Sequence, residues 1–149
     1  MLNDILRAAQ KNQENAILFL QMLIQTPSPS GEERKAARIT AKEMKASGFD
    51  EVAVDHLNDV MGTIKGVGGG RSILFNGHLD HVSPGKMDEP YSAKLMNGSA
   101  FGVEGEVVYG RAASDNKGAL AAMVMAGKII KDLGIQLKGD FKVAAVSLE

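Results

Sequence analysis

The order of the predicted elements assigns this chain to the α/β class of layered folds. Two segments with helical periodicity open the chain, short strand-like segments fill its middle, and a long helix is followed by a last apolar strand. Helices and strands in this order are typical of helices packed against a sheet. The 149 residues suggest one domain that is long enough to bury a real core.

The first helix is predicted over residues 4–25. Apolar residues between Ile5 and Leu23 recur near one helical face. Pro27 and Pro29 follow, and because proline lacks a backbone N–H and clashes with the preceding turn, they end the helix.

A second helix is predicted from Ser30 to about Ala46. Ser30 and Glu33 have the spacing of a capping box, in which each side chain satisfies a free backbone N–H of the first helical turn. Gly48 is well placed to end this helix.

The apolar pattern then changes to that of strands. Short strands are predicted at 52–54 and 60–64, and an apolar run within 72–76 predicts a buried strand. Residues 81–100 are rich in turn residues, and a hairpin strand is expected around 106–109.

The last part of the chain repeats the change from helix to strand. A long helix is predicted over residues 116–133, with Gly134 as its stop, and a final buried strand over 141–148. The chain ends on Glu149 directly after this strand, which suggests a fragment of a longer protein. An unfinished sheet would leave an open strand edge near residues 141–148, through which copies of the chain could associate.

Composition excludes several classes of function. Lys plus Arg number 17 and Asp plus Glu 18, and this balance argues against nucleic acid and other polyanions as partners. The absence of cysteine excludes disulfides, thiolate zinc sites, iron–sulfur clusters and cysteine nucleophiles. There is no secretory signal and no apolar run near the roughly 18 residues that span a bilayer, so we expect a cytoplasmic location and no membrane partner.

The first residues that could carry chemistry are Gly-His-Leu-Asp at 77–80. They follow a predicted strand, and strand ends are where α/β sheets place functional groups. On an extended segment His78 and Asp80 point the same way, so Asp80 could accept the second ring N–H of a metal-bound His78 and orient it. When the two residues are considered alone, a surface turn with a local hydrogen bond is the simpler interpretation.

Two further candidates follow other elements. Asp115 precedes the predicted helix 116–133, and Glu149 follows the last strand. Each has a simple alternative, because Asp is a favoured helix N-cap and Glu149 could be a polar residue that leaves a strand. Together with His78 they place His and carboxylate groups in three loops at strand ends, a donor set that suits zinc, cobalt or manganese.

Three segments of the chain form a pattern in order and spacing. They are residues 26–33 (Thr-Pro-Ser-Pro-Ser-Gly-Glu-Glu), 75–80 (Phe-Asn-Gly-His-Leu-Asp) and 109–118 (Tyr-Gly-Arg-Ala-Ala-Ser-Asp-Asn-Lys-Gly). With them the chain resembles the N-terminal part of the co-catalytic metallohydrolases grouped with acetylornithine deacetylase, succinyl-diaminopimelate desuccinylase, aminoacylase and glutamate carboxypeptidase. The resemblance implies a three-layer α/β/α fold with a mixed sheet. It also implies that residues 1–149 are part of the catalytic domain and that the lid or dimerisation domain is absent.

The resemblance also implies a role for each candidate residue. His78 would bind one metal ion, Asp115 would bridge two, Asp80 would orient His78, and Glu149 would be the general base. The cofactor would be two divalent metal ions, zinc before cobalt or manganese, and the reaction would be hydrolysis of an amide bond in an N-acyl amino acid or short peptide. The family often has a cis peptide bond after the bridging aspartate, here between Asp115 and Asn116. A homodimer is one oligomeric state that the resemblance leaves open.

The chain departs from the family's pattern mildly at Ala112, where Gly is common, and at Asn116, where Met is common, and it departs in two further respects. His81 stands where the family usually has Thr, and we expect a solvated loop histidine there rather than a competing ligand. The family's remaining ligands would lie beyond Glu149, which leaves His78 and Asp115, whereas catalytic zinc normally has three protein ligands. We therefore hypothesise that these residues belong to a metal-dependent hydrolase but that the 149-residue chain alone is inactive. The alternative is a truncated, inactive fragment or an interaction module.

Overall fold

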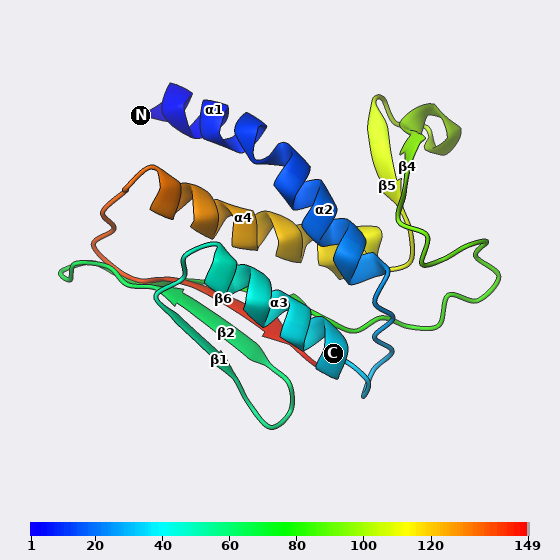
Figure 1. Ribbon diagram of the computed structural model, residues 1–149, viewed down its shortest axis with the longest axis horizontal. Helices are drawn as coiled ribbons and strands as arrows, with labels where there is room; N and C mark the ends of the chain where they lie inside the picture. Colours follow the sequence, from blue (N-terminus) through cyan, green and yellow to red (C-terminus); the bar gives the residue numbers. More distant parts are fainter. Residues whose placement is uncertain (149) are drawn as a thin grey trace.

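The computed structural model describes residues 1–148 and shows helices on a mixed sheet, beside a small hairpin (Figure 1). The strand order is β1-β2-β6-β3, formed by Glu51–Val54, Val60–Ile64, Phe141–Val146 and Ile73–His78. The pairs β1–β2 and β2–β6 are antiparallel, whereas β3 runs parallel to β6. The predicted α/β class with a mixed sheet is therefore confirmed.

The helices of the described residues form one layer over this sheet (Figure 1). They are α1 (Leu2–Lys11), α2 (Gln13–Ile24), α3 (Arg34–Ala46) and α4 (Gly118–Asp132). α3 packs on β1 and β2, α4 packs on β3 and β6, and α1 and α2 contact α4. None of these helices is long and apolar enough to cross a membrane.

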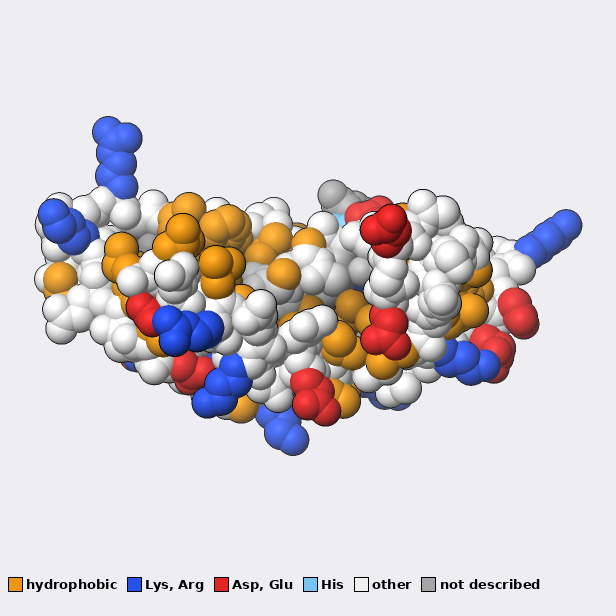
Figure 2. Space-filling view, turned by 90° about the horizontal axis from the view of Figure 1, so that it is seen from above, with side chains coloured by type: hydrophobic (Ala, Val, Ile, Leu, Met, Phe, Trp, Pro, Cys, Tyr) orange, Lys and Arg blue, Asp and Glu red, His pale blue; other side chains and the backbone are white. Residues whose placement is uncertain are grey.

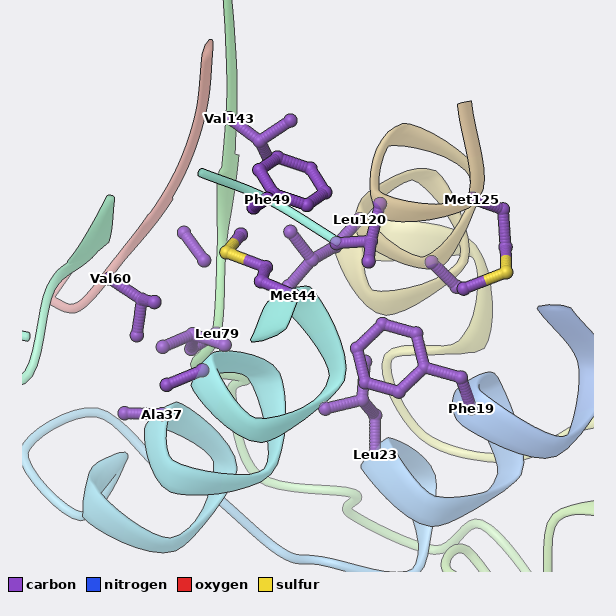
Figure 3. Packing of buried hydrophobic residues seen from close by; sticks show 14 of the residues in the cluster. Phe19, Leu23, Ala37, Met44, Phe49, Val60, Leu79, Leu120, Met125 and Val143 are labelled. Carbon is purple, nitrogen blue, oxygen red and sulfur yellow. The ribbon is translucent and has the colours of Figure 1, made fainter. Parts of the chain in front are cut away.

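The hydrophobic core lies between the helices and the sheet (Figure 3). Phe19 of α2, Met44 of α3, Leu120 of α4 and Val143 of β6 contribute to it. Leu79, which follows β3, is fully buried in the same core. Because removing apolar surface from water is the main force that holds the chain together, Leu79 anchors the loop that begins at the end of β3.

The prediction of one helix over residues 4–25 is wrong, because the segment forms two helices that meet at Asn12. The Asn12 side chain donates a hydrogen bond to the backbone oxygen of Ala8 and accepts one from the Asn15 amide. Asn side chains compete with the helix for backbone groups, which explains the break. The apolar period continues across the bend and does not reveal it.

The predicted capping box at Ser30 and Glu33 is also wrong. α3 begins at Arg34, and its N-cap residue Glu33 makes no side-chain hydrogen bond to the helix. Ser30 Oγ instead donates to Asp80, and Glu33 Oε1 accepts from backbone N–H groups elsewhere. The spacing of the two residues is that of a capping box, but Ser30 bonds to the distant Asp80, and Glu33 accepts from the nearby Gly31 and the distant Leu148.

The expectation that residues 72–76 form a buried strand fails, although the strand itself forms. Ile73, Leu74 and Phe75 are 51%, 55% and 39% exposed. In the described part of the chain β3 is an edge strand, and β6, which we expected to carry the open edge, lies between β2 and β3. An apolar run looks the same in edge and central strands, so the sequence could not distinguish them.

The hairpin consists of β4 (Lys94–Asn97) and β5 (Glu106–Tyr109), joined through the short helix η1 (Gly98–Phe101). The predicted strand at 106–109 is confirmed, whereas β4 lies in a segment that we assigned to turns.

The surface of the molecule mixes the two signs of charge. Figure 2, which views the molecule from above, shows basic and acidic side chains interspersed on the face in view.

Candidate active site

His78 is the last residue of β3, at the end of the sheet. Its Nδ1 lies 3.1 Å from the backbone oxygen of Asp80 and 3.4 Å from Asp80 Oδ1. Its Nε2 lies 3.0 Å from Oδ1 of Asp115. The structure therefore brings together three of the four predicted site residues, and the fourth, Glu149, lies outside the described residues.

Oxygen atoms face both ring nitrogens of His78. A neutral imidazole carries one N–H and can donate to only one of these oxygens. If the single N–H is on Nδ1 and donates to Asp80, Nε2 is an acceptor that lies 3.0 Å from a second acceptor, the Asp115 carboxylate. A positive charge on Nε2 would turn this unfavourable contact into a favourable one. A proton or a metal cation at Nε2 provides that charge, so the donor set fits a cation.

Asp80 is placed to hold the imidazole of His78. Its side chain is 6% exposed, and Ser30 Oγ donates to its Oδ2 at 2.5 Å. A carboxylate beside the second ring nitrogen of a metal-binding His sets the orientation of the ring and raises its basicity. The position of Asp80 suits that role.

Asp115 lies in η2 (Ala113–Lys117), the short segment before α4, and its side chain is 86% exposed. Its backbone is not helical, with φ −129° and ψ 94°, and a cis peptide bond joins it to Asn116. The N-cap interpretation is wrong, because α4 begins at Gly118 and no side chain caps it. The carboxylate reaches His78 and solvent instead.

His81 is buried, so the expected solvated loop histidine is wrong. Its Nε2 accepts the backbone N–H of Ser28 at 3.0 Å, and its Nδ1 donates to the backbone oxygen of Val82 at 2.9 Å. Burial lowers the pKa of His81, which favours this neutral form, although the bond to Val82 acts in the opposite direction. Both ring nitrogens are therefore used within the fold.

Lys117 is the residue that the motif contained but to which we assigned no function. Its side chain is fully buried, and its Nζ donates to the backbone oxygens of Leu23 at 2.8 Å and Thr26 at 3.0 Å. Burial lowers the pKa of Lys117 to about 8. The signal that could have identified it is a Lys directly before the apolar first turns of α4, residues 118–127.

The described residues contain no group of three or more His, Cys, Asp or Glu side chains that could hold a metal ion. His78 and Asp115 offer two donors, whereas a catalytic zinc site normally takes three from the protein. Residues 1–148 thus offer fewer donor side chains at this place than a catalytic zinc ion normally takes.

The profile of peptidase family M20/M25/M40 matches residues 74–149, which include His78, Asp80 and Asp115. The chain belongs to this family. The resemblance inferred from the three motifs is therefore confirmed.

Relatives extend this similarity toward the N-terminus. The uncharacterized protein YgeY of Escherichia coli strain K12 is 35% identical over 136 residues, which cover 89% of this chain and 31% of YgeY. The N-formyl-4-amino-5-aminomethyl-2-methylpyrimidine deformylase of Halalkalibacterium halodurans is 30% identical over 153 residues, covering 94% of this chain and 34% of the deformylase. The chain thus spans about a third of the length of these M20 relatives.

Solved structures of the M20 fold superpose on the chain. Human carnosine dipeptidase 1 has a TM-score of 0.81 at 20% identity, over 100% of this chain and 35% of the dipeptidase. YXEP of Bacillus subtilis, described as a dinuclear metal binding peptidase of the M20 family, has a TM-score of 0.67 at 17% identity, over 94% of this chain and 36% of YXEP. At these identities the likeness shows a shared fold.

Proposed function

We propose that residues 1–149 are the N-terminal part of the catalytic domain of a metal-dependent hydrolase that cleaves an amide bond in N-acyl amino acids or short peptides. The observation that carries the proposal is the 3.0 Å approach of His78 Nε2 to Asp115 Oδ1. These residues stand 37 positions apart in the sequence and come from β3 and η2. The names of similar proteins, a dipeptidase and a deformylase, support an amide substrate.

In this proposal each site residue has one task. His78 and Asp115 bind divalent cations, of which zinc suits the donor set best and cobalt or manganese less well. Such cations supply Lewis acidity toward water and the amide carbonyl. Asp80 holds the His78 ring so that Nε2 is directed at the site, and Glu149 takes a proton from water and passes it to the leaving amine.

A second candidate is an inactive fragment or interaction module. It is favoured by one observation, the presence of only two metal-donor side chains at this site among residues 1–148. Under either function, a cytoplasmic location and the homodimer stay predictions.

Zinc titration by calorimetry, together with elemental analysis, tests the site. We expect the chain to bind zinc and the variants His78→Ala and Asp115→Ala to bind it at least about tenfold more weakly, because each removes a ligand atom. His56→Ala and Asp88→Ala are matched controls, since they remove an exposed His and an exposed Asp elsewhere on the surface. Equal zinc binding by all five proteins would contradict the assignment of His78 and Asp115.

Hydrolysis assays on N-acetyl amino acids and dipeptides test whether residues 1–149 are active by themselves. Zinc-dependent release of amine that is lost in His78→Ala would support the hydrolase and reject the inactive fragment. Zinc binding without release of amine is the result expected of the 149-residue chain alone under both candidate functions.

A further inference from the structure

The segment between α2 and α3, residues 25–33, lies against each part of the chain that carries a site residue. We call it the α2–α3 connector. It contains the Thr-Pro-Ser-Pro-Ser-Gly-Glu-Glu motif, whose resemblance to the family suggested only a turn between helices. Its hydrogen bonds reach residues 50 to 115 positions away in the sequence.

The densest contacts join the connector to the loop after β3. Ser28 donates from its backbone N–H to His81 Nε2 at 3.0 Å and from its Oγ to the backbone oxygen of Leu79 at 2.6 Å. The backbone N–H of His81 donates in return to the backbone oxygen of Ser28 at 3.1 Å. Ser30 Oγ adds the bond to Asp80, so the connector holds the loop at Leu79, Asp80 and His81.

A second contact joins the connector to the segment that contains Asp115. The buried Nζ of Lys117 donates to the backbone oxygen of Thr26, in the connector, and to that of Leu23 at the end of α2. The last carbonyl groups of a helix lack partners within the helix, and a cation close to them is stabilised by the helix dipole. Lys117 thereby ties η2, two residues after Asp115, to the start of the connector.

A third contact leads to the end of β6. Glu33 is 1% exposed, and its Oε1 accepts the backbone N–H of Gly31 at 2.8 Å and that of Leu148 at 3.2 Å. Leu148 directly precedes Glu149 in the sequence. The carboxylate of Glu33 therefore holds the segment from which Glu149 follows.

The buried residues at the connector are ionisable, which argues that they do more than fill space in the core. Burying an ionisable side chain is costly unless it is hydrogen-bonded, and an apolar residue would fill the same space without that cost. Yet Glu33, His81 and Lys117 are all buried, and each makes hydrogen bonds within or to the connector. Ser30 also bonds to the distant Asp80 instead of capping α3, and Glu33 accepts from the distant Leu148 in addition to the nearby Gly31.

We infer that the α2–α3 connector is a positioning clamp that sets the relative placement of three segments: the one with His78 and Asp80, the one with Asp115, and the end of β6 up to Leu148. Ser28, Ser30 and Glu33 are positioning residues, and none of them is a catalytic residue. The relevance of the clamp to hydrolysis rests on the proposed function, whereas its effect on the geometry of His78 and Leu148 does not.

The first test reads the geometry of His78 in the metal-free chain. The ¹⁵N resonances of the His78 ring report how its nitrogens are hydrogen-bonded. In Ser30→Ala the hydroxyl that holds Asp80 is lost, and Ser30 is exposed, so no cavity opens. We expect the ring resonances to move in Ser30→Ala and to return in Ser30→Thr, which keeps a hydroxyl.

Ser72→Ala is the matched control for this test. Its Oγ accepts the N–H of Asp140 beside the start of β3, at the opposite end of that strand from His78. This variant should leave the His78 resonances in place. Unchanged resonances in folded Ser30→Ala, or equal changes in Ser30→Ala and Ser72→Ala, would overturn the clamp.

The second test reads the contact at Leu148 by amide hydrogen exchange. Glu33→Gln keeps an oxygen that can accept from Leu148, whereas Glu33→Ala removes it. We expect exchange at Leu148 to become about tenfold faster in Glu33→Ala and to change little in Glu33→Gln, because this part-buried hydrogen bond is lost in the first case only. If Glu33→Ala does not fold, the original chain and Glu33→Gln decide the test. Protection of the Leu148 amide in both proteins supports the clamp, while absence of protection in the original chain refutes it.

These readouts are independent of zinc and of hydrolysis. Moved His78 resonances in a chain that neither binds zinc nor cleaves amides would reject the proposed function and keep the clamp. Zinc binding that depends on His78 and is unaffected in Ser30→Ala, with unmoved resonances, would reject the clamp and keep the function.

Discussion

The substitution Gly127→Ala sets two effects of known size against each other in α4. Alanine is the better helix former by about 1 kcal/mol, which would stabilise the protein. A Cβ at position 127, however, would lie 2.4 Å from Cζ and 2.6 Å from Cε2 of Phe49. Real carbon atoms do not approach so closely, so the ring or the helix would have to move.

The Phe49 ring has little space to yield. On its other side, a Cβ at Gly62 of β2 would lie 2.7 Å from Phe49 Cδ1, so the ring fits between two glycines from the helix and the sheet. The side chain is part of the buried core and lies near Phe141, with ring centroids 6.3 Å apart. Overpacking a core of this kind costs about 1–3 kcal/mol. Because two contacts are involved, we expect the upper half of that range and a net destabilisation of about 1–2 kcal/mol.

Urea unfolding of four proteins measures this balance: the original chain, Gly127→Ala, Phe49→Leu and the double variant. The smaller side chain in Phe49→Leu removes the clash, so Gly127→Ala should be neutral or slightly stabilising in that background. The denaturant slope should stay constant, because the surface exposed on unfolding is nearly unchanged. A stabilising effect of Gly127→Ala in the original chain would refute this account of the packing.

Two further outcomes are expected. In Gly77→Ala, the new Cβ would lie 2.5 Å from Oδ1 of Asn116, so the Asn116 side chain must shift. We expect this shift to displace the neighbouring Asp115 and to weaken zinc binding about tenfold in a zinc titration, and unchanged affinity would disprove the coupling. The Lys131 side chain, which donates to Asp50, holds the pKa of that carboxyl below its usual value. The ionised form of Asp50 therefore contributes stability above about pH 4, and this contribution is lost as the pH falls through the folded-state pKa. Because the ion pair is exposed to solvent, Asp50→Asn should lower the free energy of unfolding by less than about 1 kcal/mol at pH 7. Urea midpoints at pH 7 and pH 3 check this, because the difference from the original chain should shrink at the lower pH.

Local sequence signals were sufficient for much of the secondary structure. Gly48 and Gly134 end helices, and both adopt the positive φ that glycine alone tolerates well, +83° and +61°. The strands β1, β2 and β5 follow the predicted positions, because alternation of apolar residues and flanking turns depend on neighbours in the chain. The motif residues likewise identified the family, since a motif is read along the chain.

The tertiary structure alone decided which partner each polar side chain takes. Ser30 bonds to Asp80 instead of capping α3, and His81 is buried against Ser28 instead of being solvated. These partners stand at least 50 positions apart in the sequence, so no local pattern contains both members of a pair. Whether β3 lies at an edge or in the middle of the sheet depends for the same reason on which strands pair with it. The sequence thus determined most of the elements, the family and the candidate residues His78, Asp80 and Asp115. The fold determined that His78 Nε2 and Asp115 Oδ1 meet at 3.0 Å, because only long-range packing brings β3 and η2 together.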